Sequence, residues 1–230
     1  MESSISKSQE IYHYLWSNIA NMRLKPGERL SEAGLARQFH CSRVPVREAV
    51  RLLAAEGALT TFPQRGSFVS CIDMRRVERA RYLREVLETR VVLDDFDKGL
   101  LPPVLPYIKS LIKKQEEFAA YGEYDRLRDS DVEFHSLFYL IDDKEFVLEH
   151  TGERDIDYLR ARHFAMQIEQ TEKKGDAESD IVLQHRGIVE AIERGDRAAL
   201  EKEFIHHLRN LKHTLVESNL YRETYRAYFQ

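Results

Sequence analysis

Apolar residues recur at helical spacing near the start of the chain. Ile11, Leu15 and Ile19 lie four positions apart, which predicts an amphipathic helix that starts near Gln9 and ends before Pro26-Gly27. Two further short helices are predicted because each follows a serine that can cap a helix N-terminus. These serines are Ser31 and Ser42.

The third predicted helix, Arg43–Ala55, has two different faces. Its apolar residues follow the spacing i, i+3, i+4, i+7, which places them on one side of a helix. Three arginines recur every four positions on another side. The apolar stripe consists of Val46, Ala49, Val50 and Leu53, and the basic face consists of Arg43, Arg47 and Arg51. One face is therefore expected to pack and the other to remain open to an acidic partner.

A β-hairpin is predicted after this helix. The segments 58–62 and 67–72 are rich in β-forming residues and flank Pro63-Gln64-Arg65-Gly66. Three helices followed by a hairpin are the elements of a winged helix-turn-helix. In that arrangement the N-terminal turns of the third helix enter the major groove of DNA, where arginine can form two hydrogen bonds with guanine.

The predicted domain divides the contacts to DNA among its elements. Ser42, Gln64 and Arg65 are placed for phosphates or the minor groove, and Gly66 allows the hairpin tip to approach the DNA backbone closely. The alternative is that the arginines form a solvated face, with Arg47 pairing with Glu48 or a neighbouring carboxylate.

From residue 73 onward the pattern predicts long helices. The expected ranges are 74–98, 103–121, 124–141, 145–170, 177–194 and 197–225. Gly195-Asp196 predicts a tight turn between the last two, because glycine suits the left-handed position and aspartate caps the next helix. The expected fold is therefore mainly α: a winged helix-turn-helix DNA-binding domain over 1–72, followed by an all-α antiparallel helical bundle over 73–230 for ligand binding, metal binding and dimerisation.

Four residues of ligand type lie on the apolar stripes of this second region. Asp131 and His135 share one helix face, while His185 and His207 interrupt apolar stripes on two other helices. Each histidine alone is more typical of a hydrogen-bonded core residue. Together, three imidazoles and one carboxylate suit a divalent metal such as Zn, Ni, Mn or Fe. An octahedral metal held by four protein ligands would keep two positions open for a small carboxylate.

The charge is distributed unevenly between the two regions. Over the whole chain, 35 Lys and Arg against 39 Asp and Glu give a net charge of −4. Residues 1–70, however, contain 9 basic and 6 acidic residues, a net charge of +3, and residues 71–230 have a net charge of −7. No apolar stretch is long enough to span a membrane, and no secretion signal is evident, so we expect a cytoplasmic protein.

Several motifs in the first region resemble the winged-helix domain of the GntR family of bacterial transcription regulators. The motifs are residues 24–32 (LKPGERLSE), 35–39 (LARQF), 42–53 (SRVPVREAVRLL), 56–57 (EG) and 63–69 (PQRGSFV). The resemblance implies that Arg43 and Arg47 contact operator bases and that Gly66 lies at the wing tip. Ala33 stands where the fatty-acid-responsive member of the family has an operator-contacting arginine.

The second region resembles the helical C-terminal domain of the FadR branch of the same family, the FCD type. The resemblance rests on Arg84-x-x-Leu87-Glu88, Asp131-x-x-Phe134-His135, His185-x-x-Ile188-x-x-Ala191-Ile192-x-x-Gly195-Asp196 and His207-Leu208. Metal-binding members of that branch have Asp, His, His and His at similar positions. Gln184 replaces the glutamate that is common before the third ligand.

An effector carboxylate would need a cationic partner. Arg84 and Arg160 are the first candidates and Arg162 is the next, because a guanidinium can bind a carboxylate with two hydrogen bonds. The alternative for each arginine is a surface ion pair.

These observations favour a homodimeric transcription regulator that binds palindromic operator DNA and responds to a small organic acid or sugar acid. Repression relieved by ligand is the commoner arrangement in the resembled family. A metal-dependent enzyme is the rival hypothesis, but the chain has no GxSxG, phosphate-binding loop or HExxH motif and only a single Glu203-x-x-His206. A winged-helix module that does not bind DNA is expected to lack Arg43, Arg47 and Arg65, which are present. We therefore expect no catalytic residues.

Overall fold

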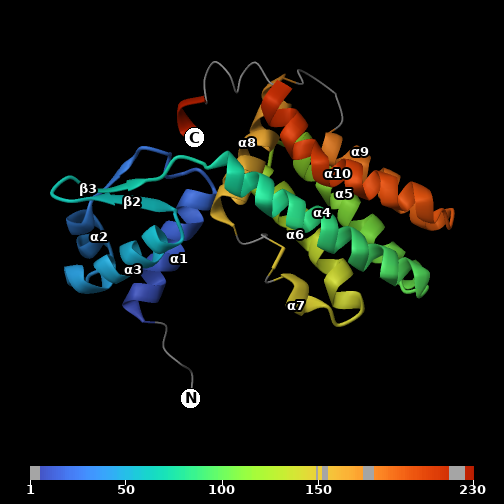
Figure 1. The fold of residues 1–230 in the computed structure, drawn as a ribbon, viewed down its shortest axis with the longest axis horizontal. Coiled ribbons are helices and arrows are strands. Elements are labelled where there is room, and N and C mark those ends of the chain that lie inside the picture. The colour runs from blue at the N-terminus through green and yellow to red at the C-terminus, as the bar shows by residue number, and fades with distance from the viewer. Residues whose placement is uncertain (1–5, 149, 152–154, 173–178, 218–225) are drawn as a thin grey trace. The chain divides into compact units, whose positions relative to one another are not determined.

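The computed structural model describes residues 6–148, 150–151, 155–172, 179–217 and 226–230. They form two compact units, whose elements are labelled in Figure 1. The first unit comprises the residues up to Met74 together with 226–230, and the second begins at Arg75. The domains expected from the sequence, 1–72 and 73–230, thus differ from these units in assigning the end of the chain to the bundle.

The first unit is a winged helix-turn-helix, as expected. Helix α3 packs against both α1 and α2. Its predicted stripe, Val46, Ala49, Val50 and Leu53, is buried. The elements are α1 (Lys7–Ala20), β1 (Arg29–Leu30), α2 (Glu32–Gln38), α3 (Arg43–Ala55), β2 (Leu59–Phe62) and β3 (Gly66–Val69).

The wing is a three-stranded antiparallel sheet in which β3 lies between β1 and β2. The predicted hairpin is closed by the pairing of Phe62 with Gly66. Strand β1 joins the other edge of β3, where Arg29 pairs with Phe68. The sequence did not predict β1, because two residues are too short to show an alternating pattern.

The described end of the chain lies beside the segment that follows β3. Ile72 and Phe229 form a parallel β-bridge. The Ile72 N–H donates to the carbonyl of Tyr228 at 2.7 Å, and the Gln230 N–H donates to the carbonyl of Ile72 at 2.9 Å. The Met74 N–H completes the pattern by donating to the carbonyl of Gln230 at 3.1 Å. These residues, 226–230, are called the C-terminal strap below.

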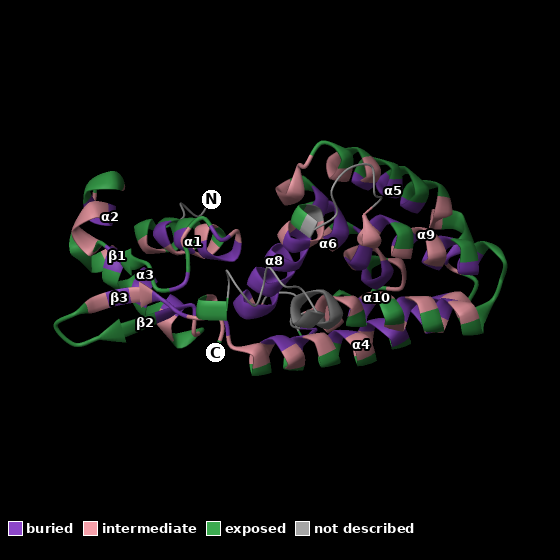
Figure 2. Cartoon of the chain, turned by 90° about the horizontal axis from the view of Figure 1, so that it is seen from above, coloured by how far each residue is buried: buried purple, intermediate pink, exposed green. Residues whose placement is uncertain are grey.

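The second unit is a helical bundle. Helix α9 packs against α5 and α10, and α6 packs against α5 and α8. Figure 2 shows that α8 is buried along most of its described length. The elements are α4 (Met74–Asp97), the 3-10 turn η1 (Pro102–Val104), α5 (Leu105–Ala120), α6 (Tyr124–Ile141), α7 (Glu145–Leu148), α8 (Ile156–Glu172), α9 (Asp180–Glu193) and α10 (Arg197–Glu217), followed by the 3-10 turn η3 (Arg226–Tyr228) in the first unit.

The prediction of one continuous helix over 145–170 is wrong. Helix α7 ends at Leu148 and α8 starts at Ile156. The new N-terminus is stabilised by Asp155, whose Oδ1 accepts the backbone N–H groups of Asp157 at 2.9 Å and Tyr158 at 3.2 Å. The predicted end of the last helix, at residue 225, lies outside the described residues.

The predicted turn between the last two helices is confirmed. Gly195 has a φ of +63°, in the left-handed region, and Asp196 Oδ1 accepts the N–H of Ala199 at 2.9 Å. None of the described helices has the length and apolar character needed to cross a membrane.

Candidate functional site

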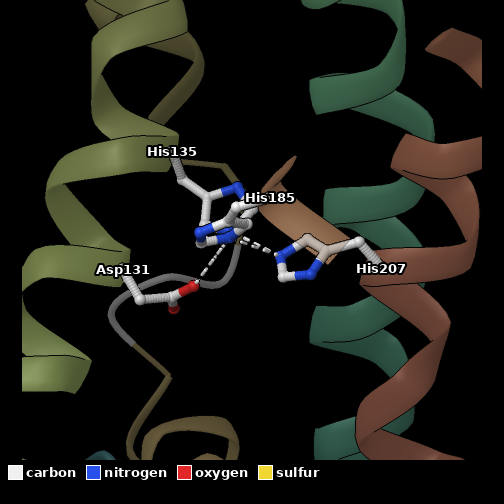
Figure 3. Close-up of side chains that lie close together, drawn as sticks. All are labelled: Asp131, His135, His185 and His207. Carbon is white, nitrogen blue, oxygen red and sulfur yellow. Dashed lines mark hydrogen bonds and ion pairs between the residues drawn. The ribbon is translucent and has the colours of Figure 1, made fainter. Parts of the chain in front are cut away.

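Three helices of the bundle bring the four predicted ligand residues together. Asp131 and His135 lie one turn apart on α6, His185 lies on α9 and His207 lies on α10. One ligand atom from each lies within 4.8 Å of the others. As Figure 3 shows, the rings and the carboxylate turn toward a common point. Asp131, His135 and His185 are buried, whereas His207 is partly exposed.

The atoms that face this point are the three Nε2 nitrogens and one carboxylate oxygen. His207 Nε2 lies 2.9 Å from His135 Nε2 and 3.4 Å from His185 Nε2. Asp131 Oδ1 lies 3.3 Å from His185 Nε2 and 3.6 Å from His135 Nε2. We call these four residues the ligand group.

Each histidine meets an acceptor at its other ring nitrogen. His135 Nδ1 lies 2.8 Å from Glu88 Oε2, His185 Nδ1 lies 2.7 Å from Gln115 Oε1, and His207 Nδ1 lies 2.9 Å from Gln184 Oε1. A proton on Nδ1 satisfies each acceptor and leaves a lone pair on each Nε2. Those lone pairs then face one another at short range, and either a proton on one Nε2 or a metal ion between them removes the repulsion. The donor set and its orientation therefore fit a divalent metal.

The amide of Gln115 has a fixed orientation. Its Nε2 donates to the backbone carbonyl of Ser130 at 3.1 Å, so its Oε1 is directed at His185. Gln115 is fully buried on α5 beside Ile108, Leu111 and Ile112. Sequence reasoning did not include Gln115 in the site. A glutamine on an apolar helix stripe was the available signal, because a buried amide requires partners.

Electrostatics in the packed site favours the neutral form of His185 and His207. Burial lowers the pKa of His185 well below its usual value, and the neighbouring His135 lowers it further. For His207, burial and the neighbouring His185 also lower the pKa well below its usual value. Neutral imidazole is the form that binds metal ions. Glu88 behaves in the opposite way: burial alone would raise its pKa, but Arg84 and His135 hold it below the usual range.

A small cavity of about 50 Å³ adjoins the ligand group. Two predicted effector residues, Arg84 and Arg162, line it together with Tyr158, and their guanidinium carbons lie 5.2 and 5.7 Å from the centre of that ring. Asp131, Gln184 and His207 also line the cavity. The third candidate, Arg160, does not belong to the lining that the structure describes. It is fully buried on α8 and pairs with Asp157.

The two cavity arginines have different partners. Arg84 is buried and donates from Nε and Nη2 to the carboxylate of Glu88, with Nη2 at 3.2 Å from Glu88 Oε2. It also donates from Nη1 to the Tyr158 hydroxyl. Arg162 pairs with Asp131, through the carboxylate oxygen Oδ2. One arginine thus contacts the acceptor of a histidine ligand, and the other contacts a ligand itself.

The basic face of the first unit is exposed. Arg43, Arg47 and Arg51 are accessible along α3. Arg47 Nε donates to Glu32 Oε2 at 3.0 Å, with 66% of the arginine side chain exposed, so the partner carboxylate is on α2 and is not the neighbouring Glu48. Ser42 occupies the N-cap position of α3, but within the described part of the chain its side chain accepts no capping hydrogen bond, contrary to expectation.

The wing tip presents the other predicted DNA-binding residues. Gln64 and Arg65 are exposed, and the guanidinium of Arg65 lies 5.6 Å from the centre of the Phe62 ring. Gly66 has a φ of +99°, which a residue with a Cβ rarely adopts. A Cβ there would also lie 3.4 Å from Arg29 Nε. Arg29 is thus a further exposed cation near the tip, missed as a site residue because β1 was not predicted.

Sequence comparisons agree with both units. A regulator in an unstable DNA locus of Streptomyces ambofaciens is 40% identical over 107 residues, covering 46% of this chain and 45% of that protein. The HTH-type regulator YdhC of Bacillus subtilis (strain 168) is 28% identical, covering 90% of this chain and 92% of YdhC. The HTH-type repressor RspR of Escherichia coli (strain K12) is 26% identical, and the match covers 90% of this chain and 88% of RspR.

Structure comparison and family matching lead to the same result. The solved structure of E. coli McbR/YncC has the same fold, with a TM-score of 0.69 and 20% identity over 92% of this chain and 98% of McbR. Residues 7–69 match the family described as "Bacterial regulatory proteins, gntR family", and residues 102–210 match the FCD domain. These families and relatives are transcription regulators and not enzymes. The chain therefore combines a DNA-binding domain of the GntR family of bacterial transcription regulators, over residues 7–69, with an FCD domain, over residues 102–210.

Proposed function

We propose that this regulator is a cytoplasmic homodimer whose operator binding is controlled by a divalent metal and a small organic acid or sugar acid in the bundle. Regulators of this family bind operator DNA and small-molecule effectors. The observation that carries the proposal is the convergence of three Nε2 atoms and Asp131 beside a cavity lined by two arginines. Zn, Ni, Mn and Fe all suit this set of donors.

The bundle residues have separate roles in this proposal. Asp131, His135, His185 and His207 hold the metal, which when bound supplies coordination positions for carboxylate oxygens. Arg84 and Arg162 bind the anion and neutralise its charge. Glu88, Gln115 and Gln184 orient the three imidazoles through Nδ1. Because Arg160 is paired with Asp157 and does not line the cavity, we do not assign it to the effector.

In the first unit, the exposed arginines of α3 read the operator. Arg43 and Arg47 lie in its N-terminal turns, from which a recognition helix reaches guanine, and Arg51 lies one turn further along. Ser42, Gln64, Arg65 and Gly66 are assigned to the DNA backbone and the adjacent groove. Two copies reading two half-sites imply a palindromic operator.

A repressor is the form of regulation we favour. The relative RspR is named as a repressor and is similar over most of both chains. Any effector that relieves repression must bind the DNA-free state more tightly than the DNA-bound state.

The test combines metal content with DNA binding. The purified protein is analysed for metals, screened by thermal shift against small carboxylates and sugar acids, and then tested on an operator selected from random DNA. We expect a bound divalent metal, an acid that raises the melting temperature only when metal is present, and weaker operator binding with that acid. A protein that binds operator DNA without retaining any metal after reconstitution would refute the sensor part of the proposal.

A further inference from the structure

Asp131 is shared between the ligand group and the cavity. Its Oδ1 faces His185 and His135, and its Oδ2 pairs with Arg162. The side chains of Asp131 and Arg162 are 1% and 8% exposed, respectively. A cation among the imidazoles and the guanidinium of Arg162 would therefore share the single negative charge of one buried carboxylate, so they compete for that charge.

The charges around Asp131 make this competition costly for a metal alone. With neutral histidines, Glu88 and Asp131 balance Arg84 and Arg162, so the buried cluster has no net charge. A divalent cation adds two positive charges. Glu169 also lines the cavity, but its single negative charge offsets only one of these two positive charges. The charge of the nearby Arg128 is already paired with Asp125 and Asp129. Excess buried charge is unfavourable unless a counter-ion enters.

The cavity is where such a counter-ion fits, since Arg84 and Arg162 both line it. The two arginines are not equivalent. Arg84 holds Glu88, which is not in the ligand group, and it can keep that partner when a metal binds. Arg162 loses part of its interaction with Asp131 once that carboxylate binds a cation.

We propose that Arg162 links the two binding events: it neutralises Asp131 when the ligand group is empty, and it binds the anion in the cavity when Asp131 holds a metal. This inference rests on the proposed metal and effector site and specifies its regulation. Metal and anion then strengthen each other's binding by the same factor, as linkage requires. The metal and the two arginines are separate cationic groups at the cavity, so a dicarboxylate can contact both at once.

The test measures Zn²⁺ affinity by chelator competition, with and without malonate or acetate. In the unmodified protein we expect malonate to tighten Zn²⁺ binding at least fivefold, more than acetate does, and Zn²⁺ to tighten malonate binding by the same factor. Arg162→Met should bind Zn²⁺ more tightly than the unmodified protein when no anion is present, because the competing cation is gone, and should show little effect of malonate.

Two further variants control for folding and charge. Arg162→Lys keeps the positive charge and should retain most of the malonate effect. Arg209→Met removes an exposed arginine of α10 and should behave like the unmodified protein. If Arg162→Met folds but keeps both the original Zn²⁺ affinity and the malonate factor, the inference is wrong. If Arg162→Met does not fold, the comparison of Arg162→Lys with Arg209→Met decides. The inference is wrong if these two variants lose the malonate effect to the same extent. Absence of Zn²⁺ binding in the unmodified protein would instead refute the proposed metal site.

The C-terminal strap carries a second, independent inference. It pairs with the segment between β3 and α4, where Ile72 is fully buried and uses both of its backbone groups. The border between the two units follows directly, after Met74.

We infer that the strap orders the segment that follows β3. A chain lacking residues 226–230 should lose amide hydrogen-exchange protection at Ile72 and Met74 at least tenfold, while Zn²⁺ affinity is unchanged. Tyr228→Ala, which keeps the strap's backbone groups, is the matched control. Unchanged exchange at Ile72 overturns the inference.

Discussion

At the scale of single residues, the candidate metal site depends on side chains that are not ligands. Glu88, Gln115 and Gln184 each face one histidine Nδ1, and two of them are amides. The convergence of the four candidate ligand residues could be predicted because polar residues at helical spacing interrupt apolar stripes. Their acceptors could not be paired with them from the sequence, because the pairing of α5 with α9 depends on helix packing.

Removal of one acceptor should weaken metal binding without removing a ligand. Gln115→Leu is expected to lower Zn²⁺ affinity by about 10–100-fold, because His185 loses the partner that fixes its ring and tautomer. Gln115→Glu keeps an acceptor oxygen and is the matched control. Chelator competition measures both. Equal Zn²⁺ affinity in Gln115→Leu and the unmodified protein would contradict this role.

Arg47 is the most direct test of the recognition face. Its ion pair with Glu32 is exposed and therefore weak, so Arg47→Ala should change the free energy of unfolding by less than about 1 kcal/mol. Loss of a guanine contact should weaken binding to the selected operator by about 1–3 kcal/mol. Gel-shift titration against competitor DNA measures the effect, with Arg37→Ala on α2 as an exposed control. Unchanged affinity would favour the solvated-face alternative.

At the scale of elements, local signals predicted most helices, and errors occurred where tertiary packing decides. The stripe of α3 and the turn at Gly195 follow from spacing and backbone preference. The break before α8 was missed because apolar residues continue on both sides of it, so no change of period marks the capping residue Asp155. Strand β1 exists only because β3 lies beside it.

An ion-pair cluster between α4 and α10 predicts a pH dependence of bundle stability. Hydrogen bonds from Arg209 and Arg81 lower the pKa of Glu85 from 4.5 to about 2, although burial opposes the shift. Because the pKa is lower in the folded state, the stabilisation is complete above about pH 4.5 and is lost as the pH falls toward 2. We expect Glu85→Gln to remove about 1 kcal/mol of stability at pH 6 and much less at pH 2.5.

Urea unfolding at the two pH values measures this difference. Glu117→Gln, a change at an exposed position on α5, should follow the unmodified protein at both. If Glu85→Gln and the unmodified protein lose stability in parallel between pH 6 and pH 2.5, the cluster does not contribute in this way.

At the scale of the whole molecule, the net charge of −4 is the sum of a positive first region and a negative second one. Association with DNA should therefore depend on the local charge of the first unit. Phosphate neutralisation releases counter-ions, so operator affinity should fall roughly a thousandfold or more between 50 and 200 mM salt if about six or more phosphates are contacted. Fluorescence anisotropy over this range measures the slope, and Arg65→Ala should make it shallower. A flat salt dependence would argue against the assigned DNA-binding face.

The pairing of Ile72 with Phe229 also affects how the protein is synthesised. The winged helix precedes the bundle in the sequence, yet the hydrogen-bond partners of Ile72 and Met74 follow the bundle and are translated after it. A nascent chain can fold its recognition helix and wing early, but it cannot complete this segment until the bundle has been made. An isolated fragment that ends at Met74 should therefore expose these backbone groups to water. Expression of the winged helix alone is a poor substitute for the full chain.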